Sequence, residues 1–441
     1  MIRRAAAVLL ALVAGSLVLP AAAPAALAVP AVSAPTPSAS PSPTPTGDPV
    51  RLAEYWLKDY GIEEAWKTTK GAGQRIAVID TGVAHVPELD GAVADGTDFS
   101  GVGAPDGRTP VGVKDINHGT LVASVAVGRG TGPDTGMIGV APEADVLAIS
   151  TSLGAAASVP ITKQIAEAMK WAVDHGATVI NLSFTTNTLT WDQSWDDAFQ
   201  YAFDHDVVVV VAAGNRGSGT KSVGAPATIP GVLTVAGVDP KGVASERSST
   251  QGITIGVAAP SEDLRGVDKD GKVISWDGTS GAAPIVAGIV ALVRAAHPDL
   301  DANNVINRIL VTAKPVTGGG NLTQALYGHG LVDANAAVNA TGIASVDENP
   351  MGSLKDWVKL YRRAAAPTPT PGQSVAPVEI EPLPAADPPL NGGTPLLPSR
   401  DSILYGTVPL IAVTLPGILV VLGVTAAARS IRSARSRTPS K

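Results

Sequence analysis

Residues 207–213 of the chain read VVVVVAA, and residues 75–80 read RIAVID. Both runs are apolar at consecutive positions rather than at every second position, which is the pattern of strands that are buried on both faces. Three further runs have the same character: DVLAIS at 145–150, ATVINLSF at 177–184 and VLTVAGV at 232–238. Strands of this kind are typical of parallel sheets.

Two stretches between these runs have apolar residues at helical spacing. They are ITKQIAEAMKWAVDHG at 161–176 and WDQSWDDAFQYAFDHD at 191–206. Strands that alternate with helices predict the α/β class, here a doubly wound, mostly parallel sheet flanked by helices.

Polar residues stand where two of the predicted strands end. Asp80 closes RIAVID, and Asn215 follows VVVVVAA within AAGN. Ligands and reactive groups gather beyond the carboxyl ends of strands in such folds. A buried acid is costly unless its charge or its hydrogen bonds are used, although a lone Asp at this place is commonly a turn or cap residue.

His118 and Ser280 each stand at the start of a predicted helix. His118 lies in NHGT (117–120), and Ser280 lies in GTSGAAP (278–284), with Pro284 in the first helical turn. Taken singly, a His at such a place is an ordinary polar residue and a Ser is an N-cap.

Together, the motifs DTG (80–82), HGT (118–120), AAGN (212–215) and GTS (278–280) resemble those of the subtilisin-like serine proteases in order and approximate spacing. The resemblance extends over residues 74–338 and includes GVAP (139–142) and GHGLVDA (328–334). It implies the subtilisin-like fold and a serine endopeptidase. An esterase with the same triad would need Gly-x-Ser-x-Gly between a strand and a helix, which GTSGA (278–282) does not match.

The resemblance assigns roles to particular residues. Asp80, His118 and Ser280 would form the catalytic triad and act through an acyl-enzyme, while the Asn215 side chain and the Ser280 backbone N–H would form the oxyanion hole. An extended substrate would bind along Ser183, Phe184 and Thr185. Because Thr185 and Thr186 stand where many relatives have Gly, we expect a narrowed pocket and a restricted set of protein or peptide substrates.

The N-terminal residues have the order of a secretory signal peptide: two Arg, an apolar run and small residues. We expect cleavage after Ala28, which gives a signal peptide at 1–28, although the same residues would suit a retained membrane anchor. Residues 29–50 are rich in Pro, Ser and Thr and predict an extended linker.

The C-terminal region predicts attachment to a membrane. After a peptidase domain at 51–345, we expect a Pro- and Ala-rich stalk at 346–401, a transmembrane helix at 402–428 and a basic tail at 429–441. The positive-inside rule places that tail in the cytoplasm and the peptidase domain outside the cell membrane. A buried core helix is the alternative for the apolar run.

This arrangement of segments resembles the mycosins, the membrane-anchored subtilases that accompany type VII secretion systems, and GIEEAW (61–66) adds to the likeness. It implies a link to a type VII secretion apparatus. A different class of function also fits the sequence, namely a structural component of a membrane export complex in which activity is dispensable.

Composition excludes several other classes of function. The net charge of -7 and the lack of a basic stripe in the globular part exclude a nucleic-acid binder, and the absence of Cys excludes thiol chemistry and Cys-ligated metals. The His residues outside the motifs have no spacing of metal ligands. The sequence indicates no cofactor and leaves structural calcium open.

Overall fold

The computed structural model describes residues 47–112, 115–153, 157, 159–317, 321–362 and 408–435. The chain divides into two compact units, one within residues 1–364 and the other within residues 365–441. The predicted signal peptide at 1–28 lies outside the described residues, as do most of the linker and the greater part of the stalk.

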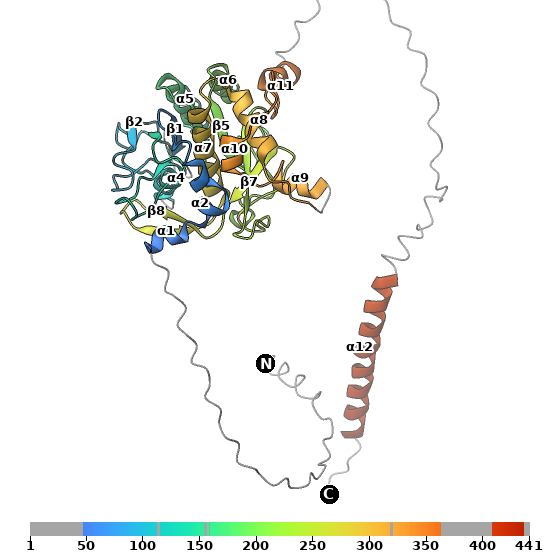
Figure 1. The fold of residues 1–441 in the computed structure, drawn as a ribbon. Helices are drawn as coiled ribbons and strands as arrows, with labels where there is room; N and C mark the ends of the chain where they lie inside the picture. Colours follow the sequence, from blue (N-terminus) through green and yellow to red (C-terminus); the bar gives the residue numbers. More distant parts are fainter. Residues whose placement is uncertain are drawn as a thin grey trace, which may run out of the picture. The chain divides into compact units, whose positions relative to one another are not determined.

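A seven-stranded sheet forms the centre of the first unit (Figure 1), and its strands pair in parallel throughout. Its order is β2-β3-β1-β4-β5-β6-β7. The strands are β1 (Arg75–Asp80), β2 (Val93–Asp98), β3 (Asp145–Ser150), β4 (Val179–Leu182), β5 (Val208–Ala212), β6 (Leu233–Val238) and β7 (Ile255–Pro260).

The direction of strand addition reverses at β1. The chain moves outward from β1 to β2, and the later strands return through β3 to the other side of β1. A crevice opens at the carboxyl ends of the strands where such a reversal occurs, and Asp80 is the last residue of β1. The doubly wound, parallel sheet that the sequence predicts is confirmed.

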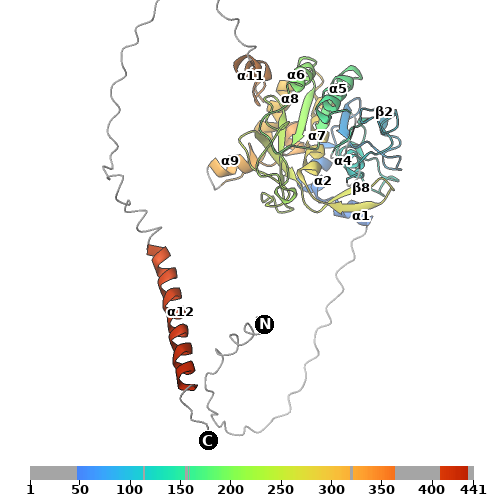
Figure 2. The same cartoon turned by 180° about the vertical axis from the view of Figure 1, so that it is seen from behind.

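Two pairs of helices cover the sheet. α5 (Ile161–Asp174) and α6 (Ser194–Asp204) pack against each other and lie side by side in both views (Figures 1 and 2). α4 (His118–Val127) packs against α7 (Thr279–Ala296), which crosses strands β4 to β7. α7 is almost entirely buried because its apolar residues occupy its whole circumference, as expected for a central core helix.

Smaller elements complete this unit. An antiparallel hairpin precedes α7 and consists of β8 (Leu264–Val267) and β9 (Val273–Trp276). The remaining elements are η1 (Arg216–Ser218), α8 (Ala302–Thr312), α9 (Asn321–Tyr327) and α10 (Ala334–Asn339).

An N-terminal arm of three short helices lies against the domain: α1 (Pro49–Ala53), α2 (Tyr55–Asp59) and α3 (Ile62–Ala65). Trp56 and Ile62 are completely buried, so the arm belongs to the core. The Glu54 carboxylate accepts a hydrogen bond from the Ile138 N–H (3.0 Å), which joins the arm to the segment after α4.

Residues 346–362 correct the predicted stalk. The sequence places a stalk from residue 346, but the structure shows this stretch packed on the first unit and ending in α11 (Leu354–Tyr361). Leu354, Trp357 and Val358 stand at helical spacing behind the N-cap Ser353, a local pattern that the stalk prediction overlooked. The side chains that this helix contacts lie far away in the sequence.

The contacts of α11 are specific. Leu354 is buried, and the Trp357 ring lies 4.4 Å from that of Trp191. The Arg362 guanidinium lies over both rings and pairs with the Asp196 carboxylate at 2.5 Å. Cation–π and ionic contacts therefore attach the end of this segment to the loop before α6 and to α6 itself.

The second unit contains α12 (Val408–Arg435). Its stretch Leu410–Arg429 is long and apolar enough to be a candidate membrane span, and its described side chains are exposed within this unit. α7 passes the same test of length and composition but is mostly buried in the domain. The helix continues beyond the predicted end at 428 and includes the first residues of the basic tail.

Candidate active site

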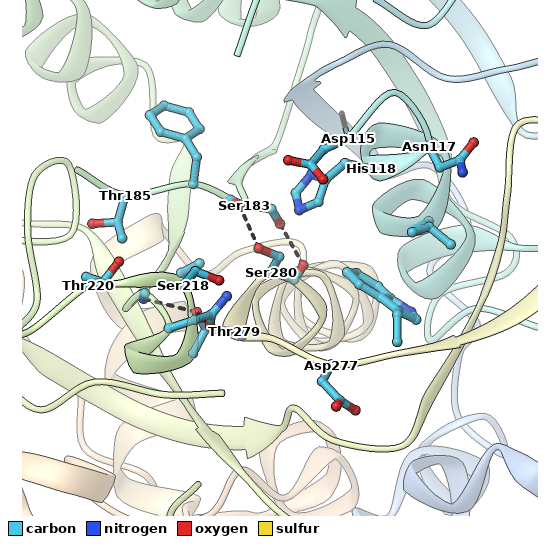
Figure 3. Close-up of a pocket in the computed structure, with 16 residues that line it drawn as sticks. Asp115, Asn117, His118, Ser183, Thr185, Ser218, Thr220, Asp277, Thr279 and Ser280 are labelled. Atoms are coloured by element: carbon cyan, nitrogen blue, oxygen red, sulfur yellow. Dashed lines mark hydrogen bonds between the residues drawn. The ribbon is translucent and has the colours of Figure 1, made fainter. Parts of the chain in front are cut away.

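The three residues of the predicted triad come from separate elements that meet at the carboxyl end of the sheet. Asp80 is the last residue of β1, His118 is the first of α4 and Ser280 is the second of α7. His118 and Ser280 line a common cavity of about 520 Å³ (Figure 3). Chain segments 38 and 162 residues apart, by subtraction of these residue numbers, are thus brought to one place.

Asp80 and His118 form a close pair. The Nδ1 atom of His118 lies 2.8 Å from Oδ1 and 2.9 Å from Oδ2 of Asp80, whose side chain is completely buried. The backbone N–H of Thr81 donates to the same Oδ1 atom (2.7 Å). Because the carboxylate holds Nδ1, the other ring nitrogen, Nε2, is directed toward the cavity.

The charges around the imidazole set its pKa. Burial lowers the pKa of His118, but the negative charge of Asp80, its hydrogen bonds to the ring and the nearby Asp115 carboxylate outweigh that effect. The pKa of His118 therefore lies above its ordinary value. Trp276 lies edge-on to the ring, with the ring centres 6.1 Å apart.

Ser280 lies at the beginning of α7, where helix N–H groups face the cavity. In the described part of the chain the backbone N–H of Ser280 donates no hydrogen bond. The helix dipole also favours negative charge at this place. The Ser280 hydroxyl donates to the carbonyl of Ser183 (2.9 Å). Among the described residues no hydrogen bond joins it to His118, whose ring points toward Ser280 in Figure 3.

Asn215 has one defined orientation. Its Oδ1 atom accepts hydrogen bonds from the N–H of Thr279 (2.8 Å) and from the hydroxyl of Thr279 (2.9 Å). Thr279 also accepts a hydrogen bond from the Gly214 N–H through its hydroxyl oxygen (3.0 Å). With its oxygen occupied, Asn215 has only its NH₂ group to offer to a ligand in the cavity.

The small residues of the motifs permit close approach of backbones. The Thr81 hydroxyl accepts from the Gly119 N–H (2.9 Å), which joins the end of β1 to α4. A Cβ atom at Gly119 would lie only 2.3 Å from the carbonyl oxygen of Gly82, so no larger residue fits beside His118. The motif residues next to the reactive side chains therefore fix their separation.

The predicted substrate-binding residues line the same cavity. Ser183 is buried, and its hydroxyl donates to the Ser280 carbonyl (2.9 Å). Phe184 packs edge-on against Trp195, with centres 6.4 Å apart. Thr185 donates its hydroxyl to the Gly224 carbonyl (2.9 Å).

The structure adds cavity residues that the sequence reasoning did not select: Trp276, Asp115 and Thr220. Trp276 stands four residues before Ser280 and Asp115 three before His118, so proximity to the motifs was the available signal. Thr220 follows AAGN by five residues and carries no signal of its own. Among the residues that the structure describes, no group of three or more His, Cys, Asp or Glu side chains could hold a metal ion.

Comparison with known proteins agrees with this geometry. The subtilase family, Peptidase S8, matches residues 71–330, more than half of the chain. The chain belongs to the subtilase family and is a subtilisin-like serine endopeptidase.

Within that family the chain is similar to the mycosins. Mycosin-4 of Mycobacterium tuberculosis is 33% identical over 356 residues, which cover 71% of this chain and 74% of that protein. The crystal structure of MycP1 with its N-terminal propeptide removed is 29% identical and superimposes with a TM-score of 0.56, covering 67% of this chain and 99% of the other. The structure of the MycP3 protease from the type VII (ESX-3) secretion system is 33% identical and superimposes with a TM-score of 0.54. This match covers 67% of this chain and 88% of the other.

Proposed function

We propose that this protein hydrolyses peptide bonds with Asp80, His118 and Ser280 as a catalytic triad. The Ser280 hydroxyl attacks the scissile carbonyl while His118 takes its proton, and an acyl-enzyme forms as His118 passes the proton to the leaving amine. A water molecule then releases the acid product by the same route. Asp80 holds the imidazole in orientation and stabilises its charged form.

The observation that carries this proposal is the Asp80–His118 pair beside Ser280. A buried carboxylate that engages Nδ1 at 2.8 Å leaves Nε2 for a hydroxyl on the cavity side. The Ser280 hydroxyl needs only a rotation about its Cα–Cβ bond to exchange the Ser183 carbonyl for another acceptor, and catalytic hydrogen bonds are commonly completed only when substrate binds.

The oxyanion of the tetrahedral intermediate would be stabilised by two donors. These are the backbone N–H of Ser280 and the side-chain NH₂ of Asn215. Thr279 orients Asn215 before any substrate arrives, so no reorganisation is required when charge develops.

We further propose that the protein acts outside the cell membrane on proteins handled by a type VII secretion system. Support comes from the similarity to MycP3, from the candidate span Leu410–Arg429 and from the basic residues after it. A signal peptide at 1–28 and a cytoplasmic C-terminus complete this arrangement.

A serine-reactive fluorophosphonate tests the assignment on the full-length protein in detergent. The wild type should be labelled, and Ser280→Ala and His118→Ala should not, because one lacks the nucleophile and the other its base. Ser218→Ala is a matched control, since Ser218 also lines the cavity and is exposed. Labelling that persists in Ser280→Ala would contradict the assignment, and a folded wild type without labelling would favour a structural role in an export complex.

A further inference from the structure

The geometry of the oxyanion donors determines where a substrate side chain must go; this inference rests on the proposed function. The cavity that contains Ser280 and Asn215 is also lined by the segment after β4 and the segment after β5. A substrate whose scissile carbonyl is held by these two donors would therefore direct the side chain on its acyl side, P1, between the two segments. Thr185 belongs to the first segment, and Gly214 and Thr220 belong to the second.

Two methyl groups cover the floor of this space. Gly214 has a φ of +103° and carries no side chain. A Cβ atom placed on Gly214 would lie 2.5 Å from Cγ2 of Thr185 and 2.7 Å from Cγ2 of Thr220. The two methyl groups therefore occupy the volume directly above the glycine. Figure 3 shows the two threonines next to each other at this end of the cavity.

Neither methyl group can easily move away. The Thr185 hydroxyl donates to the carbonyl of Gly224 (2.9 Å), and this bond fixes which arm of the branched side chain faces the cavity. Thr220 is only 9% exposed, and its N–H donates to the Asn215 carbonyl (3.1 Å). β-Branched side chains also have few alternative rotamers.

We propose that Thr185 and Thr220 limit the P1 residue of the substrate to small side chains such as Gly, Ala and Ser. A longer aliphatic or aromatic side chain would have to displace both methyl groups from close packing. The restriction acts on the transition state, because the P1 backbone cannot shift without moving the scissile carbonyl away from its donors. The protein is therefore specific for small residues at the bond it cuts.

The test uses chromogenic tetrapeptide anilides that differ only at P1, with the full-length protein in detergent. For the wild type we expect kcat/KM for P1 Ala to exceed that for P1 Leu or Phe by roughly ten- to a hundredfold. The double variant Thr185→Ser/Thr220→Ser deletes the two methyl groups and keeps both hydroxyls. It should gain activity on P1 Leu and reduce this ratio by at least about tenfold.

Thr186→Ser is the matched control. The sequence predicts that Thr186 narrows the pocket together with Thr185, but in the structure Thr186 is exposed, does not line the cavity and contacts Thr188 through its hydroxyl. This control should keep the wild-type ratio. Equal cleavage of Ala, Leu and Phe substrates by the wild type would overturn the inference, as would an unchanged ratio in the double variant. Fluorophosphonate labelling of the same samples separates the two ideas: labelled protein without P1 selectivity refutes only the inference, whereas unlabelled protein refutes the proposed triad and the inference with it.

Discussion

The carboxyl end of β1 and the N-terminal arm each bury a carboxylate in the same globular unit. Asp80 is 0% exposed and Glu54 is 2% exposed. Both oxygens of Asp80 face the His118 ring, and one also accepts from a backbone N–H. Glu54 uses Oε1 to accept from the Ile138 N–H, whereas its Oε2 atom has no hydrogen-bond partner among the described residues.

The partners of these carboxylates, rather than their burial, separate the two regions. Burial raises the pKa of Glu54 to about 8, and the Ile138 N–H and the Arg51 charge offset only part of that effect. A carboxyl with one unpaired oxygen thus favours its neutral form, whereas Asp80 is arranged to hold a cation beside it. Of these two buried acids, only Asp80 faces a base, the imidazole of His118.

The largest expected effect comes from removing the charge of Asp80. Asp80→Asn should lower kcat/KM by on the order of 10⁴-fold, because His118 loses the group that fixes its tautomer and stabilises its charged form; this is the magnitude known for other serine protease triads. Steady-state hydrolysis of a P1 Ala peptide measures it, and circular dichroism checks that the variant is folded.

Glu54→Gln makes the equivalent neutralisation in the other region. At neutral pH it should leave kcat/KM within about twofold of the wild type. Glu54 does not line the cavity, and a change at a separate site has little effect on the energetics of the triad. Equal losses in the two variants would show that burial, not pairing with His118, explains the effect at Asp80.

The second expected effect is on stability and concerns Glu54→Gln. With a pKa of about 8 in the folded chain against 4.5 for an exposed Glu, the folded state retains a proton that the unfolded state releases. The contribution of Glu54 to the free energy of unfolding is then fully present below pH 4.5, declines as pH rises and is lost above about pH 8. The penalty at pH 9 is on the order of 3–5 kcal/mol.

Gln cannot ionise, so the variant escapes this penalty. Denaturant unfolding at pH 5, 7 and 9 should show an advantage of Glu54→Gln over the wild type that grows with pH. A constant difference between the two proteins across this range would contradict the raised pKa.

The same contrast explains what the sequence could predict. β1 and β3 have the boundaries expected from RIAVID and DVLAIS, because consecutive apolar residues signal a doubly buried strand locally. The sequence analysis did not predict β2 (Val93–Asp98), because VADGTD is a polar edge strand that is only partly buried and has no run of apolar residues. The site residues Asp80, His118, Asn215 and Ser280 were found through motifs. The structure brings His118, Asn215 and Ser280 to one cavity, and Asp80 is buried beside His118.

Features that depend on distant partners were not predictable. The packing of α11 rests on Trp191 and Asp196, more than 150 residues before Arg362, so the amphipathic pattern of LKDWVKLY could indicate a short helix but not the surface that it contacts. The bond from the Ser280 hydroxyl to the Ser183 carbonyl and the unpaired oxygen of Glu54 are likewise products of tertiary geometry.

The smallest expected effect tests whether the Asp115 charge helps Asp80 to raise the pKa of His118. Asp115 lines the cavity and is exposed, and its charge raises the pKa of His118 after that of Asp80. A general base must be neutral, so activity is lost as pH falls through the raised pKa of His118. Asp115→Asn removes one negative charge that favours the imidazolium and should move this acid limb to lower pH, by less than the loss of a buried charge would, since solvent screens an exposed charge.

The profile of kcat/KM between pH 5 and 9 measures the shift, and added salt supplies the control. High ionic strength should move the acid limb of the wild type toward that of Asp115→Asn, while leaving the variant nearly unchanged, because only the exposed charge is screened. A limb that moves to higher pH in Asp115→Asn would mean that the mutation acts on His118 through its packing against Trp276 or Asp80. Asp80 alone would then account for the raised pKa of His118, and the charge of Asp115 would make no contribution to it.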